Sequence, residues 1–405
     1  YYASRGLGDV YKRQDMANKD LKWETTITRN IGVDFGFFNS RLTGTIDAYW
    51  NTTKDLLMKT AIPGITGFTS TYANVGQTSN KGIEIALQGV LVKTRDWNVT
   101  AGFNINFNRG KVDKLADNVT GLYGTEWATS STFPKSDYVL KEGRPVGLVR
   151  GLTADGFYTT DDFTYENGVY TLKEGVADVS SAVFPNYHLH NGMNERPAGQ
   201  LAYPGMAKFK DLNDDGIIND DDVDVIGDMT PVHTGGFNIN ATYKNFDLGL
   251  YFNWSYGNEI YNVNKLAALY GYKEGAVYEN KLSIVKDCYK IYDVVNGELV
   301  ALTTPEQLNA ANANAKLPLA YSENGYVSTL GIEDGSYLRL NTLTLGYTLP
   351  KSMLQKAGIS NLRVYGSIYN VFTITGYSGI DAEVSTSTST KTYPQLGMDL
   401  SLKHI

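Results

Sequence analysis

The stretch WNVTAGFNINFN, residues 97–108, decides the fold class because its side chains alternate with a period of two. The odd positions are apolar: Trp97, Val99, Ala101, Phe103, Ile105 and Phe107. The even positions carry asparagine, threonine and glycine. Successive side chains of a β-strand point to opposite faces, whereas a helical period of 3.6 would scatter the asparagines around the axis. The stretch therefore predicts a strand with one apolar face and one face of amides, hydroxyls and glycine.

The same alternation recurs along the chain. It is found in residues 25–37, 42–50, 83–88, 237–243, 248–255, 338–347, 362–370 and 396–402. Together these segments predict about nine strands. Their longer runs exceed the usual length of about five or six residues in globular sheets and match a tilted span of a membrane's hydrocarbon core. Tyrosine and tryptophan near strand ends suit a membrane interface, although aromatic residues favour any sheet.

Short and long connections alternate between these strands. The short ones fall at 39–41, 94–96, 244–246 and 350–361, the last with a helical turn expected at 352–356. The long ones span 58–80, 109–235, 257–335 and 373–392. Outer-membrane barrels have this layout, with tight periplasmic turns and long extracellular loops, whereas a β-sandwich has more uniform connections. The predicted fold class is all-β, a transmembrane antiparallel β-barrel with long extracellular loops.

Composition narrows the function classes. The 405-residue chain is 42% hydrophobic and 12% aromatic, which is enough to build a folded core. Its formal net charge of −7 excludes the basic footprint of a nucleic-acid-binding protein. A single cysteine, Cys288, excludes an internal disulfide framework and a multi-cysteine metal cluster. No apolar run is long enough for a transmembrane helix.

Residues 1–14 are treated apart from the rest. The string SRGLGDVYKRQ, residues 4–14, resembles translated sequencing-adapter read-through. The alternative is a short disordered tail, and neither interpretation gives this segment a function. We assign residues 15–405 to barrel strands and extracellular loops. On the adapter interpretation the chain is expected to be a fragment.

Five stretches carry a family resemblance: residues 23–57, 74–87, 208–227, 337–350 and 362–375. In sequence and order they are similar to the SusC/RagA family of TonB-dependent outer-membrane transporters from Bacteroidota. The resemblance implies the C-terminal portion of a barrel of about 22 strands whose lumen is filled by a plug. The family usually finishes on an aromatic residue, whereas Leu402 stands at that place here and three residues follow it.

The resemblance also implies a function. It predicts import of an oligomeric nutrient, a glycan in preference to a peptide, across the outer membrane of a Gram-negative bacterium. The implied partners are a SusD-like surface lipoprotein and the TonB–ExbB–ExbD system acting on the plug. The alternative that stays open is a secreted, calcium-stabilised, β-rich glycan-binding protein. That alternative predicts polar residues on both faces of the sheet.

The sharpest chemical motif is an Asx-rich loop at residues 211–222. Its oxygen donors match the spacing of an EF-hand-type calcium loop: Asp211, Asn213, Asp215, the backbone carbonyl of Ile217, Asn219 and Asp222. Gly216 permits the sharp turn, and Asp222 in place of the usual glutamate would weaken binding. Asx-rich turns also form without metal, and no EF-hand helices flank this one. We expect a structural Ca²⁺ that orders a loop and takes no part in catalysis.

Enzymatic motifs are weak, and we predict that the protein is not an enzyme. No hydrolase elbow, zincin motif or phosphate loop stands in a strand–helix context. His188 and His190 are read as a solvent-facing loop pair, and the carboxylate pairs at 161–162 and 220–222 as solvated loop or cation ligands. A β-sheet glycoside hydrolase is a third hypothesis. Ligand contacts stay unassigned: the tyrosine-rich segments 158–170, 261–272 and 321–326 suit stacking on a ligand or packing of the loops.

Overall fold

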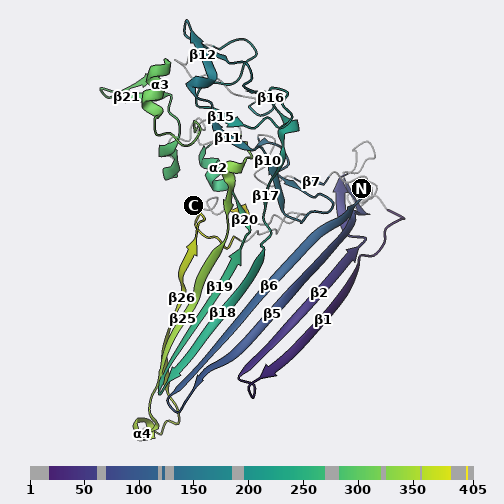
Figure 1. Cartoon of the computed structure of the whole chain (residues 1–405), viewed down its shortest axis with the longest axis vertical. Coiled ribbons are helices and arrows are strands. Elements are labelled where there is room, and N and C mark those ends of the chain that lie inside the picture. Colours follow the sequence, from purple (N-terminus) through teal and green to yellow (C-terminus); the bar gives the residue numbers. More distant parts are fainter. Residues whose placement is uncertain are drawn as a thin grey trace, which may run out of the picture.

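The computed structural model describes residues 18–61, 70–116, 121–123, 132–184, 196–269, 282–320, 325–355, 358–384 and 398–399. Its largest element is an eight-stranded sheet in the order β1-β2-β5-β6-β18-β19-β25-β26. The strands are β1 (Thr25–Phe37), β2 (Leu42–Lys54), β5 (Gly76–Lys93), β6 (Trp97–Leu115), β18 (His233–Tyr243), β19 (Phe246–Tyr256), β25 (Tyr337–Thr348) and β26 (Arg363–Thr375). Every neighbouring pair is antiparallel, and spatial order follows chain order. The sheet is a long, tilted up-and-down meander (Figure 1).

The register sorts the alternating residues onto two faces. We call outer the face that carries the cross-strand row Ile31, Ala48, Ile83 and Phe107. We call inner the face that carries the adjacent row Asn30, Tyr49, Gly82 and Asn108. On the outer face Ile31 is 63% exposed and Ile83 is 47% exposed. A continuous apolar face left open in this way suits lipid and not water, and it does not fit the secreted, two-sided polar sheet.

The connections confirm the predicted alternation. Residues 38–41, 94–96, 244–245 and 349–362 join the strands at one end of the sheet, and the last contains α4 (Lys351–Leu354). The described residues of 55–75, 116–232 and 257–336 lie at the other end, with residues 376–384 after β26 (Figure 1). No helix in the described part of the chain is long and apolar enough to span a membrane.

The prediction of a ninth strand of the large sheet at residues 396–402 is wrong for the two of these residues that the structure describes. That part is β27 (Met398–Asp399), which pairs in parallel with β20 (Glu259–Asn262) and not with the large sheet. The pairing is short and lies among the loops, because β20 follows directly on the turn after β19. The large sheet therefore ends on two open edges, β1 and β26, and it is not a closed barrel by itself. Residues 1–14 and the rest of the 396–402 segment lie outside the described residues.

The long connections fold into a second layer above the sheet, which we call the loop layer: the described residues of 116–232 and 257–336 (Figure 1). Its strands are β7 (Leu122–Tyr123), β8 (Thr132–Phe133), β9 (Tyr138–Val139), β10 (Leu148–Gly151), β11 (Ala154–Phe157), β12 (Phe163–Glu166), β13 (Val169–Leu172), β14 (Asp178–Val179), β15 (Ala207–Phe209), β16 (Ile217–Ile218), β17 (Asp224–Asp228), β20, β21 (Tyr292–Val295), β22 (Glu298–Ala301), β23 (Gly325–Tyr326) and β24 (Ile332–Asp334). Its helices are α2 (Val263–Leu269), α3 (Pro305–Asn312) and the short 3₁₀ turns η2 (Thr160–Asp162), η3 (Asp220–Asp222), η4 (Ser283–Asp287) and η5 (Thr329–Gly331). A separate hairpin, β3 (Leu57–Ala61) with β4 (Ser70–Asn74), extends the connection between β2 and β5.

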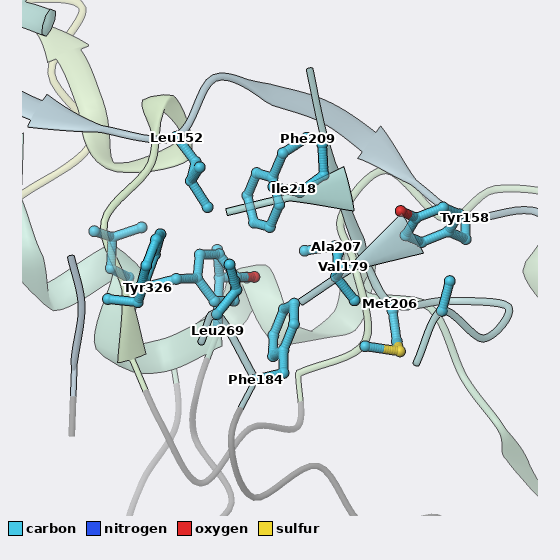
Figure 2. Close-up of a cluster of buried hydrophobic side chains, with 14 of the residues drawn as sticks. Leu152, Tyr158, Val179, Phe184, Met206, Ala207, Phe209, Ile218, Leu269 and Tyr326 are labelled. Atoms are coloured by element: carbon cyan, nitrogen blue, oxygen red, sulfur yellow. The ribbon is translucent and has the colours of Figure 1, made fainter. Parts of the chain in front are cut away.

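The loop layer has its own aromatic core. Phe184, Phe209 and Tyr326 meet in Figure 2, and the Phe209 and Tyr326 ring centroids lie 5.1 Å apart in an edge-to-face arrangement. Tyr158 and Tyr170 are fully buried. Aromatic side chains bury the largest area per residue, so a core of this kind can stabilise a layer that contains little regular structure. The layer is therefore a folded unit that sits on the rim of the sheet.

Candidate functional site: the inner face and the loop layer

The inner face of the sheet is lined by neutral hydrogen-bonding side chains. The Tyr49 hydroxyl donates to Asn108 Oδ1 at 2.7 Å. Further along, the Tyr251 hydroxyl donates to Asn240 Oδ1 at 3.1 Å, and the Asn240 amide donates to Asn238 at 3.0 Å. These groups point the same way because each occupies an inner-face position of its strand. Side-chain amides both donate and accept, so the face can bind hydroxyl-rich or amide-rich ligands.

A recess of about 380 Å³ lies in this face. Its polar walls come from Asp34, Thr45, Gln88, Asn104 and Asn238. A Cβ at Gly102 would lie 2.5 Å from Asn238 Nδ2 and 2.8 Å from Gln88 Oε1. Glycine at this position therefore lets the two amide side chains converge from neighbouring strands. The sequence pattern alone could not find the recess, because it depends on which strands are neighbours.

Two arginines of the inner face are paired with carboxylates. The Arg363 guanidinium binds Asp247, with Nε donating to Oδ1 at 2.9 Å. Arg339 is almost fully buried and donates to Asp381, to Glu383 Oε2 at 2.7 Å and to Thr373 Oγ1 at 2.9 Å. Both arginines are thus neutralised by protein carboxylates. An isolated arginine within YLRLNTL was the available signal for Arg339, but its partners could not be read from the sequence.

The predicted calcium loop is a closely hydrogen-bonded turn. Asp211 accepts the N–H of Gly216 at 2.7 Å, and Asp215 accepts the N–H of Ile217 at 2.9 Å. Asn213 Oδ1 accepts the N–H of Asp215 at 3.2 Å. Gly216 has φ +83°, a conformation that favours glycine. The structure therefore brings the first three predicted ligands together around one turn.

The last two predicted side-chain ligands cap η3. Asn219 Oδ1 accepts the N–H of Asp221 at 2.8 Å. Asp222 is fully buried and accepts the N–H groups of Leu212 at 2.7 Å and Asn219 at 2.8 Å. Within the described residues, no three His, Cys, Asp or Glu side chains form a group that could hold a metal ion. The calcium site stays a prediction, and its residues already have backbone partners.

The remaining sequence candidates divide into structural and undescribed ones. His188 and His190 lie outside the described residues. Asp162 accepts a hydrogen bond from Lys208 Nζ at 2.7 Å. Burial alone would raise the pKa of the Asp162 carboxyl. The pKa nevertheless lies below its usual value, because Lys208 and the Thr159 N–H stabilise the charged form. Among the described tyrosines of the predicted ligand segments, Tyr165 is partly buried, and Tyr158, Tyr170, Tyr261 and Tyr326 are buried in the loop layer. They pack within the protein and offer no open stacking face.

Comparisons with known proteins agree with this architecture. The family model described as "TonB dependent receptor-like, beta-barrel" matches residues 2–193. TonB-dependent receptor P3 of Formosa agariphila is 30% identical over 374 residues, which cover 92% of this chain and 32% of that protein. TonB-dependent receptor SusC of Bacteroides thetaiotaomicron is 28% identical over 405 residues, which cover 97% of this chain and 33% of that protein.

A solved structure is similar as well. The RagAB peptide transporter matches with a TM-score of 0.63 and 25% identity over 90% of this chain and 33% of that chain. The chain spans about a third of the length of the curated relatives it matches. An antiparallel meander with an apolar outer face, a polar inner face and long loops at one end defines an outer-membrane barrel. In these comparisons the chain is similar to TonB-dependent receptors, and its architecture is that of a barrel segment of the SusC/RagA type.

Proposed function

We propose that the protein carrying this chain imports an oligomeric nutrient, a glycan in preference to a peptide, across the outer membrane. The observation that carries the proposal is the inner face of the sheet. It presents amides, hydroxyls and glycine on the side that would line the lumen of the complete barrel. Its arginines Arg339 and Arg363 are paired with carboxylates. Sugars are recognised mainly through neutral hydrogen bonds and apolar faces.

A partner on the extracellular side belongs to the same proposal. By resemblance, a SusD-like lipoprotein covers the loop layer, and TonB–ExbB–ExbD supplies energy through a plug. The hairpin β21–β22 projects from the layer (Figure 1), with Val294 64% and Leu299 70% exposed. Exposed aliphatic side chains at a protruding hairpin suit a protein contact. The similar RagAB structure is that of a peptide transporter, so peptide import is the competing outcome.

The test is nutrient uptake by cells that depend on the whole protein. A strain lacking it is complemented with the intact gene and grown on either oligosaccharides or oligopeptides as the sole carbon source, with and without TonB. We expect TonB-dependent growth on a glycan. Growth restored on peptides alone would overturn the glycan preference, and recovery of the protein outside the outer-membrane fraction would overturn the whole proposal.

A further inference from the structure

Four side chains form a cross-strand row on the outer face, near the loop end of the sheet. We call it the basic row, and its members are Arg29, Trp50, Lys81 and Arg109. Each is directly opposite the next in the register of β1, β2, β5 and β6. All four side chains are exposed. The next outer row toward the short turns is the apolar one that contains Ile83 and Phe107.

The charges of the basic row are poorly compensated. Lys81 and Arg109 are directly opposite, a separation of about 5 Å between neighbouring strands, and like charges placed so destabilise a sheet. The side chains of Arg29 and Lys81 make no hydrogen bond or ion pair within the described residues. Arg109 Nη1 donates to the carbonyl oxygens of Pro231 at 2.9 Å and Val232 at 3.1 Å, which leaves its charge without a carboxylate.

A cavity opens beside this row. It measures about 700 Å³ and is lined by three members of the row, Trp50, Lys81 and Arg109, but not by Arg29. Lys111, the inner-position residues Asn51 and Asn80, and the acids Asp228 and Glu259 also line it. Both acids have backbone partners: Glu259 accepts the N–H of Asp228 at 2.7 Å, and Asp228 accepts the N–H of Thr230 at 2.9 Å. Neither forms an ion pair with the cations of the row. Lys111 binds Asp113 at 3.2 Å, whereas Arg29, Lys81 and Arg109 have no carboxylate bound to them in the part of the chain that the structure describes.

We propose that the basic row and its cavity bind the phosphate-bearing headgroup of a lipid in the outer leaflet of the membrane. Guanidinium and ammonium groups are the side chains that bind phosphate oxygens. Trp50 lies between Arg29 and Lys81, and tryptophan favours the membrane interface. The acyl chains of such a lipid would lie over the apolar rows below. The row faces away from the inner face, so its ligand is not the imported nutrient.

The proposal rests on the barrel orientation of the proposed function, with the long loops outside the cell. A long charged side chain near the end of a spanning strand can extend its charged group to the membrane–water interface. Arg29 can therefore lie on a surface that lipid covers. Each cation near an anionic membrane surface contributes about 1 kcal/mol. That corresponds to roughly fivefold in affinity for each charge.

The test measures lipid retention by the whole protein that carries this chain, purified in an uncharged detergent. Monophosphoryl lipid A is added, and bound copies are counted by native mass spectrometry. We expect the double variant Arg29→Gln/Lys81→Gln to bind it more weakly by roughly fivefold for each cation removed. Neither side chain has a partner inside the described chain, so the variant should fold.

The controls separate charge, position and ligand. Lys93→Gln removes a lysine at the opposite end of β5 and should leave retention unchanged, whereas Arg29→Lys/Lys81→Arg keeps the charges and should retain the lipid. Equal retention by the Gln double variant would overturn the proposal, as would equal retention of the same lipid without its phosphate. Full displacement by inorganic phosphate at equal concentration would identify a free-anion site instead. Nutrient uptake by the same variants is measured separately, because import can persist when lipid binding is lost.

Discussion

At the residue scale, buried polar groups whose hydrogen bonds are all made stabilise the loop layer. Asp222 is the clearest case, because both of its carboxylate oxygens accept backbone N–H groups. An unsatisfied buried donor costs more than the bond itself contributes. The Asx-rich loop therefore has a structural role that does not depend on any metal.

We predict that Asp222→Ala lowers the free energy of unfolding of the loop layer by about 1–3 kcal/mol. The substitution leaves the N–H groups of Leu212 and Asn219 without acceptors and removes the cap of η3. Hydrogen exchange of the whole protein would measure the loss at residues 211–223. Asp221→Ala is the matched control, since that side chain is exposed, and equal loss of protection in both variants would contradict the assignment.

The calcium prediction is tested at the same loop. We propose that Ca²⁺ protects residues 211–222 from exchange and proteolysis, and that Asp215→Ala abolishes the effect. Asp214→Asn is the control: it removes the same charge from a position that the calcium spacing does not use, and asparagine tolerates its φ of +58°. Identical protection with Ca²⁺ and with a chelator would show that the hydrogen bonds of the turn are sufficient.

At the element scale, single side chains connect segments that the sequence separates widely. Glu333 on β24 accepts from Lys265 Nζ of α2 at 3.1 Å and from the N–H of Ser378 at 2.9 Å. Burial alone would raise the pKa of this carboxyl. The hydrogen bonds from Ser378 and the charge of Lys265 outweigh burial and hold the pKa below its usual value.

This shift predicts a pH dependence. A carboxyl with a lowered pKa in the folded state contributes stability above its unfolded pKa of about 4.3 and loses it as the pH falls through the lower folded value. We expect the thermal midpoint of the loop layer to fall from about pH 5 downward, and to fall less in Glu333→Gln. Melting curves between pH 3 and pH 7, roughly this window, would measure it. The same slope in both proteins would assign the acid sensitivity to other groups.

Arg339 on β25 anchors the segment that follows β26. Arg339→Met would remove three hydrogen-bond partnerships and leave Asp381 and Glu383 without their cation. Both acids are about half exposed, so we expect the free energy of unfolding to fall by only about 1–3 kcal/mol. We also expect added protease to cleave residues 376–384. Arg363→Met is the control, because Arg363 is more exposed than Arg339 and its pair with Asp247 lies at the other end of the sheet. Cleavage at equal rates would refute the anchor.

At the scale of the whole molecule, two open strand edges limit what the chain can do alone. Lipid leaves no solvent for the unpaired N–H and C=O groups of β1 and β26. We predict that the isolated 405-residue chain, refolded in detergent, associates through these edges and does not form a monomeric barrel. Size-exclusion chromatography with light scattering would measure this. A monodisperse monomer that stays folded in lipid would show that the chain closes by itself.

The loop layer marks the limit of prediction from the sequence. The sequence predicts residues 109–235 and 257–335 as long loops whose tyrosines stack on a ligand or pack together, and their described residues build one core. The contacts that build it are remote in the chain: Thr160 donates to Asn309 at 2.7 Å, and the N–H of Leu152 donates to the carbonyl of Val327 at 2.8 Å. Short strands in irregular loops carry no periodicity, so no local pattern could place them.

The sequence by itself determined the strands of the sheet, their two faces and the alternation of short and long connections. It could do so because alternation is a property of neighbouring residues along one strand, and residues 97–108 already contain it. Only the tertiary structure decided the recess around Gly102, the anchor at Arg339, the basic row and the place of Met398–Asp399. Each of these depends on cross-strand register or on loop packing, which are set by contacts between residues far apart in the chain.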